Sequence, residues 1–94
     1  MTYKRGLTAL AHATRRQLFE QLVGQPRSVN ELVAGTAISQ PAVSQHLRVL
    51  RSAGLVEVRK QGAQRIYSVR PEGLRQLRDW IELCLESSGP TATA

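Results

Sequence analysis

A helix with both of its ends marked is predicted for residues 38–54, which read Ile38-Ser39-Gln40-Pro41-Ala42-Val43-Ser44-Gln45-His46-Leu47-Arg48-Val49-Leu50-Arg51-Ser52-Ala53-Gly54. Ser39 can accept a hydrogen bond from a free N–H of the first turn, and Gly54 can adopt the left-handed conformation that ends a helix. Val43, Leu47 and Leu50 recur at helical spacing and predict one buried stripe. The helix would be roughly 20 Å long, which suits the major groove of DNA.

The opposite face of this helix carries amides, hydroxyls and arginines but no carboxylate. Burying the apolar stripe turns Pro41, Gln45, Arg48 and Ser52 outward and places Gln40, Ser44 and Arg51 at one side. Such a face can donate hydrogen bonds to phosphates and to base edges. Because any surface helix has a polar outer face, the helix alone leaves DNA recognition and a merely solvated surface as equal alternatives.

The charge of the chain favours a polyanion as partner. The 94 residues hold 13 Lys and Arg against 7 Asp and Glu, for a net charge of +6. Residues 1–70 hold 11 of the bases and only 3 of the acids, and they include the helix described above. A concentrated positive surface attracts DNA through release of counterions.

Length and composition limit the remaining classes of protein. A chain of 94 residues makes one domain with a small core, so a second subunit is expected to add stability. A single cysteine excludes a disulfide within the chain. No apolar run is long enough to cross a bilayer and no signal peptide is recognisable, so we expect a cytoplasmic protein.

Three helices are predicted before the helix at 38–54. They span residues 7–11, 14–23 and 29–34, with Thr14 as the cap of the second and a Ser28–Glu31 capping box at the third. Leu7, Leu10 and Ala11 lie on one side of the first helix. The predicted inward residues of the other two are Leu18, Phe19, Leu22, Val23, Val29, Leu32 and Val33. The helix at 29–34, a short turn and the helix at 38–54 form a helix-turn-helix pattern, in which the later helix reads DNA. We call the helix at 38–54 the reader helix.

A β-hairpin is predicted after the reader helix. Residues 55–59 and 65–70 are rich in β-branched residues, and the polar segment 60–64 contains a glycine. Arg59, Lys60 and Arg65 make its tip basic, as expected of a wing that touches the DNA backbone or minor groove. The alternative is a hairpin that covers the core and carries solvated arginines. Tyr67 is expected to pack rather than to contact a base.

The last predicted helix, residues 71–86, is more apolar than a domain of this size can cover. Its apolar positions are Leu74, Leu77, Trp80, Ile81, Leu83, Cys84 and Leu85. Much of this surface is therefore expected to contact a second subunit. Residues 87–94 have no periodicity and no large apolar residue, and are expected to be a disordered tail.

Across residues 5–86 the sequence resembles the ArsR family of winged-helix repressors. Three blocks carry the resemblance, namely residues 10–16 (LAHATRR), residues 38–56 and residues 65–69 (RIYSV). The resemblance implies a homodimer, joined by the first and last helices, that binds an operator and blocks transcription. It also implies DNA contacts early in the reader helix, at positions that match Gln40, Pro41, Ser44 and Gln45.

Many members of this family release DNA when a metal binds, through cysteines before the reader helix or Asp, His and Glu on the last helix. Here residues 28–35 contain no Cys or His, and the last helix contains no His. Only His12, His46 and Cys84 remain as soft ligands, too few for a zinc-type site. We expect no metal and no cofactor, and Cys84 is expected to be a small packing residue.

The predicted fold is mainly α with a small β-hairpin, a winged helix-turn-helix of order α-α-α-α-β-β-α in residues 1–86. The predicted function is sequence-specific transcriptional regulation by a homodimeric repressor on an inverted-repeat operator, with no enzymatic activity, because no nucleophile arrangement or phosphate loop is present. A protein-interaction module and a non-specific architectural DNA binder are the alternatives, and no inducer is indicated. The predicted DNA contacts are Ser39, Gln40, Pro41, Ser44, Gln45, Arg48, Arg59, Lys60 and Arg65. The predicted dimer contacts are Leu7, Leu10, Leu77, Trp80, Ile81 and Cys84.

Overall fold

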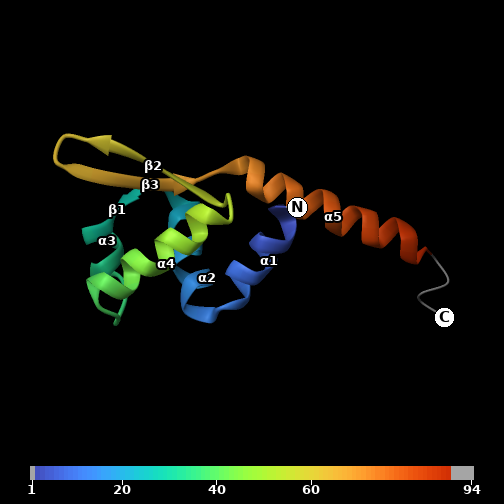
Figure 1. Ribbon diagram of the computed structural model, residues 1–94, viewed down its shortest axis with the longest axis horizontal. Coiled ribbons are helices and arrows are strands. Elements are labelled where there is room, and N and C mark those ends of the chain that lie inside the picture. Colours follow the sequence, from blue (N-terminus) through green and yellow to red (C-terminus); the bar gives the residue numbers. More distant parts are fainter. Residues whose placement is uncertain (1, 90–94) are drawn as a thin grey trace.

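The computed structural model describes residues 2–89, which form five helices and a three-stranded sheet (Figure 1). The elements in order are α1 (Thr2–Ala11), α2 (Ala13–Gly24), β1 (Arg27–Ser28), α3 (Val29–Ala34), α4 (Gln40–Ser52), β2 (Val56–Gln61), β3 (Gln64–Val69) and α5 (Pro71–Ser88). The predicted order of helices and hairpin is confirmed, with one short strand added to it. The fold is a winged helix-turn-helix, in which α4 is the reader helix and β2 and β3 form the wing.

The ends of α4 lie where the sequence predicts them. The Ser39 hydroxyl accepts the backbone N–H of Ala42 at 3.4 Å and caps the first turn. Gly54 has a φ of 77° and donates its N–H to the Arg51 carbonyl at 3.0 Å, which ends the helix in the left-handed conformation open to glycine. The reader helix is thus fixed in length by local chemistry at both ends.

The core lies between α2, α3, α4 and the base of the wing. Its fully buried large side chains are Leu18, Leu32, Leu47, Leu50, Leu55, Val43 and Val56. The predicted stripe of α4 is confirmed, since all three of its residues are fully buried. Burying a leucine or valine in this way stabilises the fold by about 1.5–3 kcal/mol each, and the stripe therefore sets which face of α4 points outward.

The first helix differs from its prediction. α1 begins at Thr2 instead of Leu7, and the residue that it buries most deeply is Ala9, 1% exposed, whereas Leu7 is 39% exposed. A β-carbon added at Gly6 would lie 3.5 Å from Leu77, so α1 packs closely on α5 at this point. A small residue such as Ala9 gives no hydrophobic periodicity, so the sequence did not indicate this buried position.

The junction between α1 and α2 is held by His12 and two arginines. The His12 ring nitrogen Nδ1 accepts the Arg15 N–H at 3.4 Å, so His12 is the cap of α2 and the predicted cap, Thr14, is wrong. Arg15 and Arg16 donate through Nη1 to the carbonyls of Ala9 at 3.4 Å and Leu10 at 2.8 Å. These bonds satisfy carbonyls that the end of α1 leaves free.

The predicted face of α2 is also wrong at one residue. Leu18, Phe19 and Leu22 are buried as predicted, but Val23 is 59% exposed. Val23 lies one residue before the helix ends at Gly24, where no other element covers it. The capping box of α3 is confirmed: the Ser28 hydroxyl accepts the Glu31 N–H, and the Glu31 carboxylate accepts the Ser28 N–H.

The sheet has the order β1-β3-β2, with both pairings antiparallel. The short strand β1 is absent from the prediction, and it pairs Ser28 with Ile66 of β3. A tight turn at Gly62 and Ala63 joins β2 to β3, with Gly62 at a φ of 63°. The wing extends from one end of the body and α5 from the other (Figure 1).

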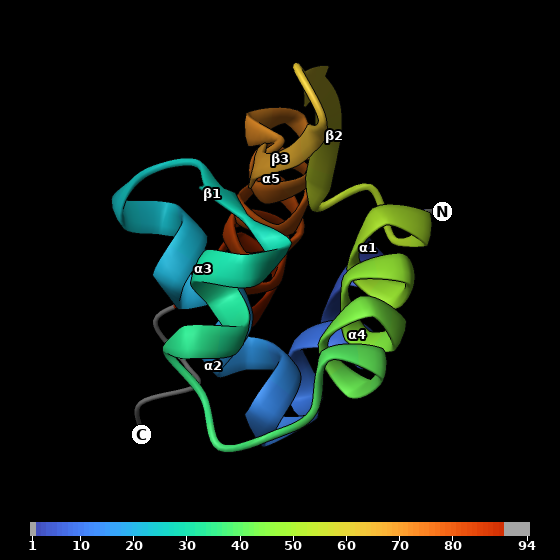
Figure 2. The same ribbon diagram turned by 90° about the vertical axis from the view of Figure 1, so that its left-hand side faces the viewer.

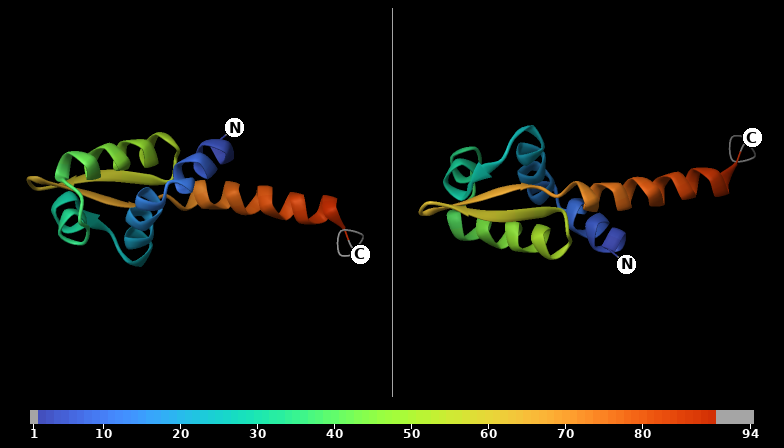
Figure 3. Two further views of the ribbon diagram at one scale, coloured as in Figure 1. Left: turned by 90° about the horizontal axis from the view of Figure 1, so that it is seen from below. Right: turned by 90° about the horizontal axis from the view of Figure 1, so that it is seen from above.

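The last helix is longer than predicted. α5 continues to Ser88, two residues beyond Glu86, so the first residues of the predicted tail are helical. Residues 90–94 of that tail lie outside the described part of the chain. Because α5 projects from the body, the molecule measures 54 × 24 × 22 Å (Figure 3).

Candidate nucleic-acid interface

Three elements meet at the end of the molecule opposite α5. Figure 2 looks onto this end, where α3 and the beginning of α4 lie side by side and the wing rises above them. The apolar stripe of α4 holds that helix against the core, which turns its polar face away from the core. The helix-turn-helix and the wing are therefore presented together.

The outward face of α4 has the composition predicted for it. Gln40, Pro41, Gln45 and Arg48 are exposed, and Ser44 is half-buried. Arg48 donates to the Gln45 side-chain oxygen at 3.3 Å, which holds the two side chains together. Amide and guanidinium groups side by side on one helix can address base edges and phosphates in the same groove. Ser39 uses its hydroxyl to cap the helix, so its first role is to position this face.

A hollow of about 400 Å³ lies between α4 and the wing. Its lining comes from α3, α4 and β3 and consists of Val29, Gln40, Ser44, Arg48, Arg51, Arg65 and Tyr67. Three guanidinium groups therefore surround one concave surface that contains no carboxylate. The arrangement concentrates positive charge at the place where a groove edge and its phosphates would enter.

A second hollow, of about 260 Å³, continues this surface toward the tip of the wing. It shares Val29, Gln40 and Arg65 with the first hollow, and adds Asn30 from α3 and Gln64 from β3. Asn30 and Gln64 bring further amides to the lining, and no acidic residue is among the residues that form it. The first turn of α4 thus lies at the junction of two polar hollows.

The wing divides its basic residues between two faces. Lys60 and Arg65 are direct partners in the antiparallel register, so they lie on one face with Tyr67, the face toward α4. Arg59 pairs with Ile66 and lies on the opposite face. The predicted set Arg59, Lys60 and Arg65 therefore does not form one cluster, because neighbouring residues of a strand alternate between faces.

Three residues of the hollow, Val29, Arg51 and Tyr67, were not among the predicted contacts. Arg51 lies three residues after Arg48 and seven after Ser44, so helical spacing was sufficient to include it. Tyr67 packs against the core as predicted, but it also lines the hollow beside Arg65. Its double position depends on the pairing of β2 with β3, which the sequence pattern did not fix.

His46, on the flank of α4, joins the reader helix to the α1–α2 junction. Its Nδ1 accepts a hydrogen bond from Nε of Arg15 at 3.4 Å, and its ring lies 4.8 Å from the ring of His12. Burial, and then the nearby charges of His12 and Arg15, hold the pKa of His46 below its ordinary value of 6.5. At neutral pH His46 is therefore an uncharged acceptor that anchors α4.

The far end of the molecule presents uncovered apolar side chains. Ile81 is 49% exposed and Leu85 is 68% exposed, and Leu74, Leu83 and Cys84 are exposed with them. Trp80 is half-buried and stacks on Tyr3 of α1 with ring centres 5.3 Å apart. Leu74, Ile81 and Leu85 recur at helical spacing and form one exposed apolar face of α5, which is a candidate protein contact.

The predicted dimer residues do not all lie on that surface. Leu77 is buried within the chain against α1, and Leu10 is half-buried against the core, so neither belongs to the uncovered face. Leu7, Ile81 and Cys84 are exposed. The prediction that Cys84 packs is not met within a single chain, since its partners would have to come from a second one.

The residues do not fit the metal sites of the ArsR type. Within residues 2–89 no three His, Cys, Asp or Glu side chains come close enough together to hold an ion. His12 and His46 already use their Nδ1 atoms as acceptors from Arg15, and Cys84 lies on the projecting α5.

Within residues 2–89, no helix combines the length and apolar character needed to cross a bilayer.

Comparison with known families gives one consistent result. The model of the family described as "Bacterial regulatory protein, arsR family" matches residues 12–58, from the cap of α2 into the wing. The HTH-type transcriptional regulator Rv2034 of Mycobacterium tuberculosis is 47% identical over 74 residues, which cover 79% of this chain and 69% of that protein. The HTH-type transcriptional repressor SmtB of the same species is 37% identical over 71 residues, covering 76% of this chain and 53% of that protein.

A solved structure agrees with the sequence matches. The homodimeric winged helix-turn-helix DNA-binding domain Mb0332 of Mycobacterium bovis, a possible ArsR-family regulator, superposes with a TM-score of 0.74 at 28% identity. The superposition covers 88% of this chain and 77% of that one. The chain thus spans between about half and about three quarters of the lengths of these proteins.

Proposed function

Because the chain belongs to the ArsR family of bacterial regulatory proteins, we propose that it is a homodimeric repressor that binds an inverted-repeat operator through α4 and the wing. The family is one of transcriptional regulators, and the chain carries the whole helix-turn-helix on which DNA binding depends. A protein of this kind acts in the cytoplasm, where the chromosome is. We assign the domain to residues 1–86.

The observation that carries this proposal is the hollow between α4 and β3. It brings Gln40 and Ser44, which can pair with base edges, next to Arg48, Arg51 and Arg65, which can neutralise phosphates. A surface with only the arginines would bind any duplex. The amide and hydroxyl groups between them give a means to distinguish sequences.

A homodimer is supported by the apolar face of α5. Leu74, Ile81 and Leu85 are exposed along that face in the single chain, and the related Mb0332 domain is homodimeric. In a twofold dimer two copies of α4 enter successive major grooves, with half-site centres about 10 base pairs apart. The operator is therefore expected to be an imperfect inverted repeat. A dimer bound there would exclude polymerase, which is the basis for proposing repression.

The protein-interaction alternative finds less support at this surface. Protein contacts are usually centred on exposed aromatic or aliphatic anchors, and the α4 face and adjoining hollows offer amides, hydroxyls and guanidinium groups instead. The uncovered apolar anchors lie on α5, at the opposite end. The architectural alternative, binding without sequence preference, is separated by the following experiment.

The test measures wild type, Gln40→Ala and Gln45→Ala against the operator and a scrambled duplex at one fixed salt concentration. Each variant should lose on the order of 1–3 kcal/mol on the operator and much less on the scrambled duplex, since a base contact is lost. Gln17→Ala, an exposed glutamine on α2, is the matched control and should bind both duplexes like wild type.

Arg65→Ala should weaken both duplexes by similar factors, because a phosphate contact carries no sequence information. Equal losses on both duplexes for the glutamine variants would show that α4 holds the backbone without reading bases. The architectural function would then replace the one proposed here.

A further inference from the structure

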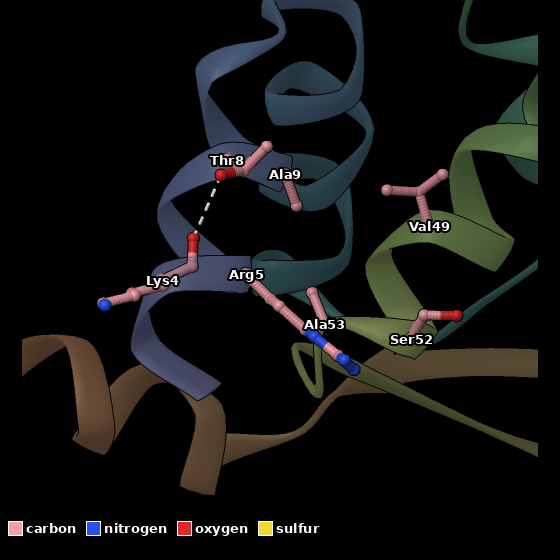
Figure 4. Close-up of a pocket in the computed structure, with 7 residues that line it drawn as sticks. All are labelled: Lys4, Arg5, Thr8, Ala9, Val49, Ser52 and Ala53. Atoms are coloured by element: carbon pink, nitrogen blue, oxygen red, sulfur yellow. Dashed lines mark hydrogen bonds between the residues drawn. The ribbon is translucent and has the colours of Figure 1, made fainter. Parts of the chain in front are cut away.

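A third hollow lies away from the DNA-facing surface, between α1 and the last turn of α4 (Figure 4). It has a volume of about 330 Å³ and is lined by Lys4, Arg5, Thr8, Ala9, Val49, Ser52 and Ala53. Ligand pockets in proteins usually measure about 300–1,000 Å³, so this hollow is large enough for a small molecule only. None of the predicted DNA contacts lines it, and neither does Leu7, which lies on the proposed dimer surface.

The floor of this hollow is apolar. Ala9 and Ala53 are buried, and Val49 is half-buried beside them. The Thr8 hydroxyl donates to the Lys4 carbonyl at 3.1 Å, so its hydrogen is already in use. A ligand that enters between α1 and α4 would therefore meet methyl groups, and an apolar body is what the floor can hold.

The mouth of the hollow is cationic. The Arg5 side chain extends from α1 toward Ala53 and ends beside the last turn of α4, whereas the Lys4 side chain points away from the hollow (Figure 4). No carboxylate lines the hollow, and within residues 2–89 Arg5 forms no ion pair. A guanidinium group offers two parallel N–H donors, which match the two oxygens of a carboxylate.

We propose that this hollow binds a small carboxylate with a compact apolar body, and that the bound ligand weakens DNA binding. The carboxylate would pair with Arg5, and the apolar body would rest on Ala9, Val49 and Ala53. The regulatory half of this inference rests on the proposed function as a DNA-binding repressor. The binding half does not, because it depends only on the hollow.

The position of the hollow supplies the coupling to DNA. Here α1 and α4 meet through alanines, so a ligand body between them favours a state in which the helices lie further apart. The reader helix moves as one rod, and its last turn lies roughly 15 Å from Gln40 at the other end. A tilt at Ser52 therefore displaces Gln40 from the wing. The ligand lowers DNA affinity because it binds the displaced state more tightly.

Binding is tested without DNA, on the purified full chain, by ¹H–¹⁵N NMR titration with benzoate and hexanoate. The neutral amides benzamide and hexanamide serve as uncharged counterparts of the same shape. We expect saturable shifts at residues 4–9 and 49–53 with the carboxylates and at least tenfold weaker binding of the amides. Arg5→Gln should weaken carboxylate binding at least fivefold, and Lys4→Gln, which removes the same charge from the same turn, should stay within twofold of wild type.

Two results would overturn the site: no saturable shift with either carboxylate, or equal losses for Arg5→Gln and Lys4→Gln. Both variants change exposed residues, so their spectra can confirm the fold. The regulatory half is measured separately, as operator affinity with and without saturating carboxylate, and we expect at least a fivefold decrease in wild type and none in Arg5→Gln. Carboxylate binding with unchanged operator affinity would overturn the coupling. Failure to bind any duplex in the absence of ligand would overturn the proposed function and leave the binding result standing.

Discussion

Gly73, in the first turn of α5, packs directly on the backbone of Gly54, the residue that ends α4. A β-carbon at position 73 would collide with the Gly54 carbonyl oxygen and crowd the Leu55 backbone. The end of the reader helix and the beginning of α5 are therefore in backbone contact, with no side chain between them.

Gly73→Ala is predicted to destabilise the fold by about 1–3 kcal/mol, because the methyl group must displace backbone atoms. Gly24→Ala is the matched control, since a β-carbon at Gly24 meets nothing within 4 Å. Gly24 lies in the last turn of α2, where alanine should be neutral or slightly stabilising. Urea denaturation of both variants measures the difference, and equal stabilities would contradict the close packing of α4 on α5.

Lys60→Gln is predicted to have opposite effects on stability and on DNA affinity. Lys60 and Arg65 are direct cross-strand partners, and like charges in that position destabilise a hairpin by up to about 1 kcal/mol. Removing one charge should raise the free energy of unfolding slightly. It should also lower affinity for all duplexes and reduce the slope of log K against log salt by about 1.

Arg59→Gln is the comparison for that variant, since it removes one charge from the opposite face of the same hairpin. Arg59 is a predicted phosphate contact, so the variant should also lose DNA affinity. Its free energy of unfolding should not change, because the cross-strand partner of Arg59 is the uncharged Ile66. A Lys60→Gln protein less stable than Arg59→Gln would show that Lys60 and Arg65 do not repel one another.

Ile81→Asp is predicted to weaken the dimer at least tenfold. The side chain is half exposed on the apolar face of α5, and a buried, unpaired carboxylate at an interface is costly to desolvate. Operator affinity should fall with dimer affinity. Sedimentation equilibrium measures the dimer, and Gln25→Asp at the exposed end of α2 controls for the added negative charge. A wild-type protein that sediments as a monomer at every concentration would rule the dimer out.

Acid is predicted to destabilise the fold through His46. The folded-state pKa of His46 is below 6.5, chiefly because of burial, so the unfolded chain binds a proton at a higher pH than the folded chain. Neutral His46 therefore makes its full contribution to the free energy of unfolding above about pH 6.5. That contribution is lost as the pH falls below this value, until His46 is protonated in the folded state too. Urea denaturation between pH 7.5 and 5.5 should show this decrease, and His46→Gln should flatten it. An unchanged slope in the variant would assign the acid sensitivity elsewhere.

The parts of the fold that the sequence predicted correctly depend on local chemistry. Ser39 and Gly54 fix the ends of α4 by hydrogen bonds and backbone geometry that neighbouring residues determine. The capping box at Ser28 and Glu31 is equally local. The regular spacing of large apolar residues was enough to orient α4, and with it the outward face proposed to bind DNA.

The features of the fold that the sequence did not predict depend on distant residues or on small residues. Strand β1 exists only because Ser28 meets Ile66 of β3, a partner far along the chain. Ala9 is 1% exposed, and alanine gives no pattern that indicates such burial. Alternation along β3 places Arg65 and Tyr67 on one face, but only the packing of distant elements decides that this face turns toward α4 and forms the hollow.

The projecting end of α5 has a consequence for how the chain folds. Its last turns lie beyond every other element (Figure 3), and Ile81 and Leu85 there are 49% and 68% exposed. A helical segment of two turns is marginal in water unless it packs on something. Amide hydrogen exchange in this segment should therefore slow as protein concentration rises, because the order of the segment comes from a second copy. Dissociation of the dimer and unfolding of the last turns of α5 are therefore expected to occur together.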